Sequence, residues 1–549
     1  MHTEEFELKA NIVDLHKRSI YPAIISVKGE RIESIQPIET TDALPYVLPG
    51  FVDAHIHIES SMLPPAEFAR IALTHGTVAT VSDPHEIANV LGVDGVRFML
   101  EDAAKSPLHF CFGAPSCVPA TSFETAGAEI LADEIAYMFD ELGLTYLSEV
   151  MNYPGVLFND PMVMAKLQEA QKRNLPIDGH APGLKGERAA QYAAAGISTD
   201  HECFTMEEAQ DKLAAGMKII IREGSAAKNY PALHELIGKY PDKVMFCSDD
   251  KHPDDLILGH INELVKRALK DGYELMDVLS IACKIPVEHY RLPIGLLREG
   301  EYADFIAVDN LADFSVTDVW IKGKQIVQNG STDIKYQATS TPNLFVKNEV
   351  TESDIQVPQT KDYLRVIEAI NGELITGSKI MKGKIQDGFW VQDTDQDILK
   401  IVVVNRYNLA PPAIGFINGF GLNYGAIASS VAHDCHNIIA VGASDKAICA
   451  AIEVIQQNQG GVSVVDENGI ADILPLPIAG IMSNLKAEDV AAAYQRLDQT
   501  AKELGSKLSA PYMSLSFMGL LVIPALKMSD LGLFDGAAFQ FVGVETESR

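Results

Sequence analysis

Histidine and carboxylate residues recur along this chain with spacings that suit a metal site. His55 and His57 are separated by one residue, and on a β-strand this spacing turns both imidazoles to the same face. The other candidate donors follow at intervals and are Glu149, His180, His201 and Asp249. Imidazole and carboxylate donors suit Zn²⁺, Mn²⁺ or Fe²⁺ and not soft Cu(I). A single His-x-His pair is weak evidence of a metal site, so the prediction depends on the elements that would bring the six residues together.

The elements expected around these residues are those of a (β/α)8 barrel. From Leu48 onward, short apolar runs alternate with helix-like stretches, which is the pattern of parallel βαβ units. Eight runs are predicted as the barrel strands: Gly50–His55, Thr77–Ser82, His109–Ala114, Thr145–Glu149, Pro176–His180, Gly196–His201, Lys218–Arg222 and Lys243–Asp249. Each candidate donor stands at or just beyond the end of one of these runs, and those ends meet on the catalytic face of such a barrel. We therefore predict a TIM-like barrel over residues 48–290, with the metal site on that face.

Two further units are expected beside the barrel. Residues 1–47 contain short strand-like runs with a hairpin turn at Gly29-Glu30, and apolar runs between 291 and 335 return towards them. We predict that these two segments form a composite small β-sandwich domain. A polar stretch at 333–360 is predicted as a linker, and residues 345–549 as an additional C-terminal α/β domain. The fold class is therefore α/β.

The composition restricts the classes of partner. Lys and Arg total 44 against 75 Asp and Glu, a formal net charge of −31, which repels phosphate backbones and anionic membranes. No apolar run approaches the ~20 residues of a membrane span, and the N-terminus lacks the basic and apolar segments of a signal peptide. Seven scattered cysteines without a Cys-x-x-Cys pair predict free thiols in a reducing cytoplasm. We expect a cytoplasmic protein that acts on a small molecule, binds neither nucleic acid nor membrane and, given its large second unit, forms a homo-oligomer.

Several longer stretches carry a family resemblance that is more specific than any of these spacings. In the predicted barrel they are residues 55–62 (HIHIESSM), 82–86 (SDPHE), 148–151 (SEVM) and 178–182 (DGHAP); beyond it they are 415–421 (GFINGFG), 429–434 (SSVAHD) and 474–480 (LPLPIAG). Through the first group the chain resembles the amidohydrolase superfamily over roughly residues 5–330. Through both groups it resembles the bacterial adenine deaminase family over nearly its whole length.

This resemblance implies a binuclear metal centre in a metal-dependent hydrolase barrel. His55 and His57 would bind the more buried ion together with Asp249, while His180 and His201 would bind the second ion. Many members of the superfamily bridge the two ions with a carboxylated lysine on strand four. This chain has Glu149 at that place, so the resemblance makes Glu149 the bridging ligand. It also favours Mn²⁺ or Fe²⁺, with Zn²⁺ as a third candidate. The strand register leaves open whether Asp249 or Asp250 is the metal ligand.

The reaction implied is the hydrolytic deamination of adenine to hypoxanthine and ammonia, a step of purine salvage. A metal-activated hydroxide would attack C6, and Asp249 is the expected proton acceptor. Glu59 is the first choice for a group that protonates or hydrogen-bonds the ring nitrogens, with His85 and Glu86 as the second choice. Further candidates have two interpretations each, since they could contact the substrate or belong to structural ion pairs and networks; they are Arg222, Asp250, His433, Asp434 and His436. The three in the C-terminal domain could bind a metal or close over the substrate.

Two other functions fit part of this pattern. An N-acetylated amino-sugar deacetylase can also carry a glutamate on strand four, but the additional C-terminal domain disfavours it. The cytidine-deaminase fold uses His-x-Glu followed by Pro-Cys-x-x-Cys. His57-Ile58-Glu59 fits the first half of that motif, but the second half is absent from the sequence, which excludes this class.

Overall fold

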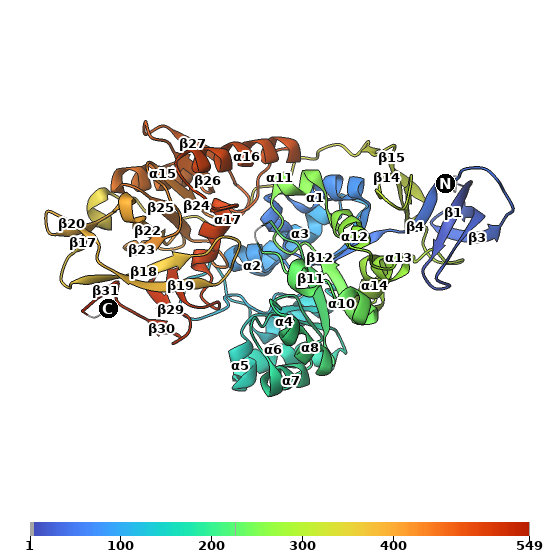
Figure 1. The fold of residues 1–549 in the computed structure, drawn as a ribbon, viewed down its shortest axis with the longest axis horizontal. Helices are drawn as coiled ribbons and strands as arrows, with labels where there is room; N and C mark the ends of the chain where they lie inside the picture. Colours follow the sequence, from blue (N-terminus) through green and yellow to red (C-terminus); the bar gives the residue numbers. More distant parts are fainter. Residues whose placement is uncertain (1–4, 226, 548–549) are drawn as a thin grey trace.

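Three parts of the chain follow one another along the molecule in a computed structural model that describes residues 5–225 and 227–547. A small β-sheet that includes the N-terminal strands lies at one end, and the C-terminal unit lies at the other (Figure 1). Between them is an α/β unit, which we call the central unit, made of residues 51–290. The C-terminal unit comprises residues 345–547. This order brings the C-terminal unit, and not the N-terminal sheet, beside α2 of the central unit, His85–Leu91.

Parallel strands follow one another through the central unit. They are β5 (Phe51–Ile56), β6 (Thr77–Ser82), β7 (His109–Phe112), β8 (Leu147–Val150), β9 (Ile177–Gly179), β10 (Thr199–Asp200), β11 (Lys218–Arg222) and β12 (Val244–Cys247). Hydrogen-bonded ladders join β5 with β6 and β6 with β7. Others join β8 with β9, β10 with β11, and β11 with β12. Single bridges from Ala114 to Leu147 and from Ile56 to Asp249 connect β7 with β8 and β12 with β5. Most of these strands are buried along their whole length, as is usual for strands covered on both faces.

Helices between these strands present one apolar face to them. In α12 (Ile261–Lys270), the buried residues Ile261, Leu264, Val265 and Ala268 have the i, i+3, i+4, i+7 spacing of such a face. The other helices of the central unit are α1 (Pro65–Ala72), α2, α3 (Val93–Ala103), α4 (Ala132–Asp140), α5 (Tyr153–Leu157), α6 (Pro161–Lys172), α7 (Gly186–Ala194), α8 (Met206–Ala214), α9 (Tyr230–Leu233), α10 (Leu236–Lys239), α11 (Pro253–Leu258), α13 (Leu275–Leu279) and α14 (Ile285–Tyr290). The polar ends of the strands therefore remain the place where side chains can converge.

The N-terminal strands and the strands after the central unit share one sheet. Its strands are β1 (Glu5–Asp14), β2 (Ser19–Lys28), β3 (Arg31–Pro37), β4 (Tyr46–Pro49), β13 (Phe305–Val308), β14 (Val316–Ile321), β15 (Lys324–Gln328) and β16 (Ser331–Thr332). β4 joins the two segments, because it pairs with β1 on one side and with β13 on the other. The hairpin turn predicted at Gly29-Glu30 is confirmed, since Lys28 pairs with Arg31 across it.

The C-terminal unit is built on a mostly antiparallel sheet with two long helices. The sheet contains β18 (Tyr363–Ala369), β19 (Thr376–Met381), β22 (Leu399–Val404), β23 (Ala413–Asn418), β24 (Ala426–Ser429), β25 (Ile438–Gly442), β26 (Gly461–Val465) and β27 (Ala471–Pro475). The helices are α15 (Asp445–Asn458) and α16 (Ala487–Glu503). Hydrogen bonds tie this unit to the central one: Ser483 N donates to Met62 O at 2.8 Å, and Ala487 N donates to Glu67 Oε1 at 2.8 Å.

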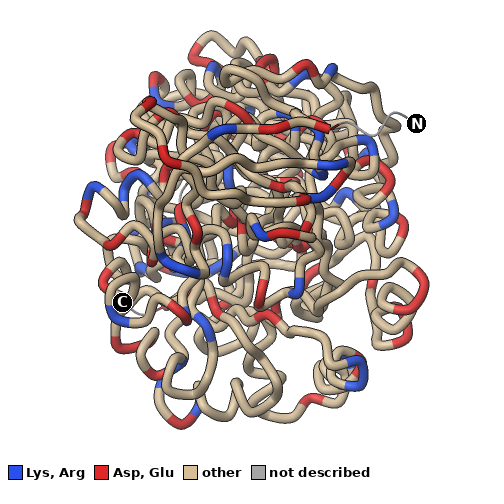
Figure 2. The backbone as a smooth tube through the Cα atoms, turned by 90° about the vertical axis from the view of Figure 1, so that its right-hand side faces the viewer, with Lys and Arg blue, Asp and Glu red and all other residues tan. Residues whose placement is uncertain are grey.

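The acidic residues form no single patch along the chain. Figure 2 shows Asp and Glu distributed over the whole visible backbone, with Lys and Arg interspersed among them. In the described part of the chain, no helix is both long and apolar enough to cross a membrane.

Candidate metal centre

Three donor atoms converge beside the ends of β5 and β12. His55 lies in β5, His57 directly follows it, and their Nε2 atoms are 3.3 Å apart. Asp249 Oδ1 lies 3.5 Å from His55 Nε2 and 3.2 Å from His57 Nε2. All three residues are at least 95% buried. Two imidazole nitrogens this close to each other and to a carboxylate oxygen form a set that one divalent cation can join.

A second set of donors lies beside the ends of β8, β9 and β10. His180 directly follows β9, and its Nδ1 atom lies 2.6 Å from Glu149 Oε2. His201 directly follows β10, and its Nε2 atom lies 3.3 Å from the same oxygen. The other oxygen of Glu149, Oε1, lies 3.2 Å from His57 Nε2. The two oxygens of one carboxylate therefore face the two groups of histidines, which is the geometry that a bridging ligand needs.

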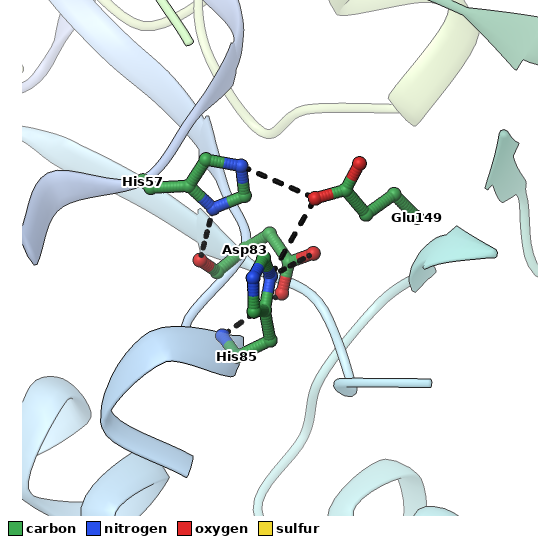
Figure 3. Close-up of side chains that lie close together, drawn as sticks. All are labelled: His57, Asp83, His85 and Glu149. Carbon is green, nitrogen blue, oxygen red and sulfur yellow. Dashed lines mark hydrogen bonds and ion pairs between the residues drawn. The ribbon is translucent and has the colours of Figure 1, made fainter. Parts of the chain in front are cut away.

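Backbone and side-chain contacts orient these donors. His57 Nδ1 lies 3.2 Å from the carbonyl oxygen of Asp83, so Nδ1–H donates there and leaves the Nε2 lone pair free for a metal. Figure 3 shows His57 and Glu149 pointing towards each other, with His85 below them. His85 Nδ1 lies 3.1 Å from Asp83 Oδ2 and 3.5 Å from Glu149 Oε1. His85 is therefore adjacent to both donor sets without being one of the six predicted ligands.

Asp249, and not Asp250, is the carboxylate beside the metal histidines. Asp249 has a positive φ of 52°, a conformation that Asp tolerates better than most residues and that is often found at functional sites. Its other oxygen, Oδ2, accepts a hydrogen bond from Arg222 NH1 at 2.6 Å. Asp250 Oδ1 instead accepts from Ser60 Oγ at 2.5 Å. The Asp249 carboxylate therefore points towards His55 and His57, whereas that of Asp250 points towards Ser60.

The charges around the centre keep both carboxylates ionised. Burial by itself would raise the pKa of Glu149, but His180, His201 and His57 together lower it well below its usual range. Burial would likewise raise the pKa of Asp249, and the Arg222 guanidinium outweighs that effect. Arg222 is itself fully buried and also pairs with Glu202, so its charge is balanced on both sides.

Three predicted residues of the C-terminal unit meet the central unit around Glu86. His433 Nδ1 lies 2.5 Å from Glu86 Oε1, and His436 Nε2 contacts the other oxygen of the same carboxylate. Asp434 Oδ1 lies 3.7 Å from His85 Nε2. Burial raises the pKa of Glu86, but His433, His436 and His85 lower it well below its usual range. The contact between the two units is therefore a network of charged groups, and the His85 ring lies between this network and Glu149.

A cavity lies over the donor atoms, and residues of the C-terminal unit form part of its lining. Of the predicted site residues, those lining it are His57, His85, Glu86, Glu149, His180, His201, Arg222, Asp249, Asp250, His433 and Asp434. Glu59 is not among the lining residues: it is buried beneath them, and its Oε1 accepts a hydrogen bond from Ile87 N at 3.3 Å. Burial raises the pKa of Glu59 to about 7.

Several residues of the site carry no local signal in the sequence. Asp83 and Glu202 stand beside predicted strand ends, yet their roles as partners of His85 and Arg222 emerge only from the fold. Leu374, Phe517 and Leu520 line the cavity from the C-terminal unit. Apolar residues of this kind are indistinguishable from core residues in a sequence.

The donor set fits a pair of divalent ions. His55 Nε2 and His57 Nε2 lie 3.3 Å apart and both lie within 3.5 Å of Asp249 Oδ1, so the three atoms can share one cation. The hard oxygen and imidazole donors suit Mn²⁺, Fe²⁺ or Zn²⁺.

The parallel strands and their donor-bearing ends belong to a known class of hydrolase. The sequence profile of the amidohydrolase family matches residues 46–326. The profile of the adenine deaminase C-terminal domain matches residues 373–540. The predicted α/β metal-hydrolase fold with an additional C-terminal unit is therefore confirmed.

Comparison with curated relatives identifies the family within this class of hydrolase. The chain is 53% identical to the adenine deaminase of Salinibacter ruber over 539 residues, which cover 98% of each protein. It is 52% identical to the adenine deaminase of a Sulfurovum species, over 98% of this chain and 99% of that one. For the adenine deaminase of Methanosarcina mazei the identity is 49%, over 97% and 98%. The chain belongs to the adenine deaminase family.

Solved structures resemble only part of the chain. N-acetyl-D-glucosamine-6-phosphate deacetylase from Mycobacterium smegmatis is similar with a TM-score of 0.46 at 15% identity, over 59% of this chain and 100% of that one. A beta-aspartyl dipeptidase from Fervidobacterium islandicum is similar with a TM-score of 0.46 at 14% identity, over 61% and 100%.

Proposed function

We propose that this protein deaminates adenine to hypoxanthine and ammonia at a binuclear metal centre. The observation that carries the proposal is Glu149, whose two carboxylate oxygens face two separate groups of histidines in a buried cavity. Membership of the adenine deaminase family supports the choice of substrate. The reaction belongs to purine salvage.

Six residues would hold the metal pair. We assign His55, His57 and Asp249 to one ion, His180 and His201 to the other, and Glu149 to both. When bound, two divalent ions supply the acidity that turns water into a nucleophile near neutral pH. The family resemblance favours Mn²⁺ or Fe²⁺ over Zn²⁺.

The remaining chemistry falls to the protein's own groups. Asp249 accepts the proton of the nucleophile, and Arg222 NH1 donates a hydrogen bond to its Oδ2 atom at 2.6 Å. His85 lines the cavity and is held by Asp83, so we assign to it the proton delivered to the ring nitrogen or to the departing amine. Glu86 orients His85 from the far side, with Nε2 and Oε1 at 3.6 Å. Glu59 acts from below by fixing the start of α2 through Ile87 N.

We propose the following architecture for this activity. Residues 48–290 form a closed (β/α)8 barrel, residues 1–47 and 291–335 form its small β-sandwich domain, and 345–549 form a C-terminal domain that roofs the active site. The bridges that connect β7 with β8 and β12 with β5 support closure of the barrel. The seven cysteines are free thiols, which supports a cytoplasmic location. A homo-oligomer is expected, and light scattering of the purified protein tests it.

Ammonia release from adenine by metal-loaded protein tests the function directly. The expected result is one ammonia per hypoxanthine formed, with activity lost on chelation and restored by Mn²⁺ or Fe²⁺. N-acetyl-D-glucosamine 6-phosphate serves as the competing substrate, because amino-sugar deacetylation is the alternative within the superfamily. Cleavage of the acetylated sugar together with inert adenine would reject the proposal.

A further inference from the structure

The roof of the cavity is a preformed surface that the C-terminal unit supplies. We define the roof as Leu374, His433, Asp434, Phe517 and Leu520, which line the cavity together. The rings of His433 and Phe517 are stacked, with their centroids 5.0 Å apart and an angle of 26° between them. Leu374, Phe517 and Leu520 belong to one buried apolar cluster. A flat heteroaromatic ring has apolar faces that match such a surface.

A buried lysine fixes two segments of this roof. Lys527, in β28 (Leu526–Ser529), is fully buried, and its Nζ donates to Leu374 O at 2.7 Å and to Phe517 O at 2.9 Å. Leu374 and Phe517 are far apart in the sequence, yet one ammonium group holds both backbones. The apolar surface is therefore set before any ligand enters.

Asp434 lines the cavity, and one of its carboxylate oxygens has no hydrogen-bond partner among the described residues. Asp434 is 97% buried, and its Oδ2 atom makes no hydrogen bond there. Its other oxygen lies 3.7 Å from both His85 Nε2 and His433 Nδ1. The two oxygens of neighbouring Glu86 also make no hydrogen bond among the described residues, but each forms an ion pair, one with His433 and the other with His436. Asp250 accepts a hydrogen bond from Ser60. A buried carboxylate oxygen without a donor costs free energy unless a ligand supplies one.

The position of Asp434 matches one edge of a purine. If the reacting carbon lies at the donor atoms around Glu149, the far side of the substrate must lie towards the roof. His85 separates Asp434 from Glu149, because its Nδ1 atom faces Glu149 and its Nε2 atom faces Asp434. The far side of adenine carries a single ring N–H in the five-membered ring, and an ionised carboxylate can only accept hydrogen bonds.

We propose that Asp434 Oδ2 accepts a hydrogen bond from the ring N–H of the substrate's five-membered ring, and that this contact selects free purine bases. The inference rests on the proposed function for the direction of the substrate. Asp434 is thus a specificity-determining residue that the C-terminal unit contributes to chemistry carried by the central unit. A purine whose ring N–H is replaced by a methyl group leaves the oxygen unpaired and is rejected.

Calorimetric binding of purine and of 9-methylpurine to the metal-loaded protein tests this directly. Neither probe has an exocyclic amine, so neither is turned over. A hydrogen bond to a charged group predicts that the native protein binds purine roughly 10- to 150-fold more tightly than 9-methylpurine. In Asp434→Ala the two affinities become equal, mainly because purine is bound more weakly. Asp434→Asn keeps the shape and one neutral acceptor, so it gives an intermediate ratio.

The controls separate recognition from folding and from catalysis. Asp472→Asn removes a carboxylate of the same unit that pairs with Arg496 outside the cavity, and it keeps the native ratio. Metal content and thermal unfolding establish that each variant is folded, and Asp434→Asn carries the test if Asp434→Ala does not fold. Equal binding of both probes by the native protein, or an unchanged ratio in the Asp434 variants, overturns the inference. Inert adenine together with an Asp434-dependent ratio would instead reject only the proposed function.

Discussion

The two halves of the active site are built in different ways. The central unit contributes its donors from the ends of parallel strands, where His180 and His201 directly follow β9 and β10. The C-terminal unit contributes His433 and Asp434 from the loop between the antiparallel strands β24 and β25, and Phe517 from a short helical turn. The first half gathers ligands for ions, whereas the second supplies apolar surface and charged partners. The chemistry and the selection of the substrate are thus carried by separate units of one chain.

The largest expected effect comes from the central half. Glu149→Gln removes the negative charge that faces both histidine groups, so metal binding and turnover should fail together. We expect the metal content to fall from two ions per chain and the rate of adenine deamination to fall by at least ~10³-fold, since the ions contribute several kcal/mol to the reaction. Elemental analysis and an ammonia assay measure the two quantities. Glu101→Gln, an exposed position in α3, is the matched control, and a Glu149→Gln variant with native metal content and rate would reject the bridging role.

The contact between the halves should give the next largest effect. His436→Ala leaves the fully buried Glu86 carboxylate without one of its partners, and breaking a buried pair typically costs about 3–5 kcal/mol of stability. Because Glu86 orients His85, the deamination rate should also fall, by roughly 10–100-fold. Metal content should stay at two ions per chain. His436→Gln retains a hydrogen-bond donor, so it should recover part of the lost stability and part of the lost deamination rate. Loss of metal ions from His436→Ala would show that metal binding by the central unit depends on the C-terminal unit.

Lys527 gives an effect that depends on pH. Burial without a carboxylate partner lowers its pKa from 10.5 to about 7 in the folded protein. Between about pH 7 and 10.5 the unfolded chain holds a proton that the folded protein has released, so stability rises with pH in this window. Relative to Lys527→Met, the free energy of unfolding of the native protein should increase by up to about 1.4 kcal/mol per pH unit. Denaturant unfolding from pH 7 to 10 measures it, and parallel curves for the two proteins would contradict the prediction.

The smallest effect is expected at the rim of the contact between the units. Glu488 pairs with Arg70 of the central unit at 2.5 Å, but its side chain is 56% exposed. Exposed ion pairs contribute less than about 1 kcal/mol. Glu488→Gln should therefore change the free energy of unfolding by less than that and leave the deamination rate unchanged. A large loss of activity would show that the two halves depend on this pair for their alignment.

The difference between the central and C-terminal units also explains which strands could be predicted from the sequence. The strands predicted at Thr77–Ser82 and Lys218–Arg222 coincide with β6 and β11, because apolar runs between helices identify buried parallel strands. In the C-terminal unit, the largely apolar run Leu399–Val404 forms β22, whereas β18 and β19 contain no such run. Polar residues such as Arg365 in β18 and Lys379 in β19 interrupt their apolar residues, and β18 pairs in parallel with β23, which is distant in the sequence.

The candidate site shows the same difference between residues that local patterns predict and residues that they do not. The six expected metal donors lie together because they stand at strand ends, which local patterns reveal. Asp83 lies in the stretch 82–86, but that stretch does not reveal its role as the partner of His85, which follows from the turn that brings the two together. The pairing of His433 with Glu86 requires the C-terminal unit to pack against the central unit. The two residues are far apart in the chain, so no local sequence pattern predicts their contact.

The order of the two halves along the chain has a consequence for biosynthesis. Asp249 completes the set of metal donors, and His433 follows roughly 180 residues later, which corresponds to roughly 10–40 s of translation at ordinary rates. Because domains generally fold in the order in which they emerge, the nascent chain presents all six donors to the metal pool while the cavity still lacks its roof. With the proposed ligands, we therefore expect metal loading to be easiest during synthesis, before the C-terminal unit docks.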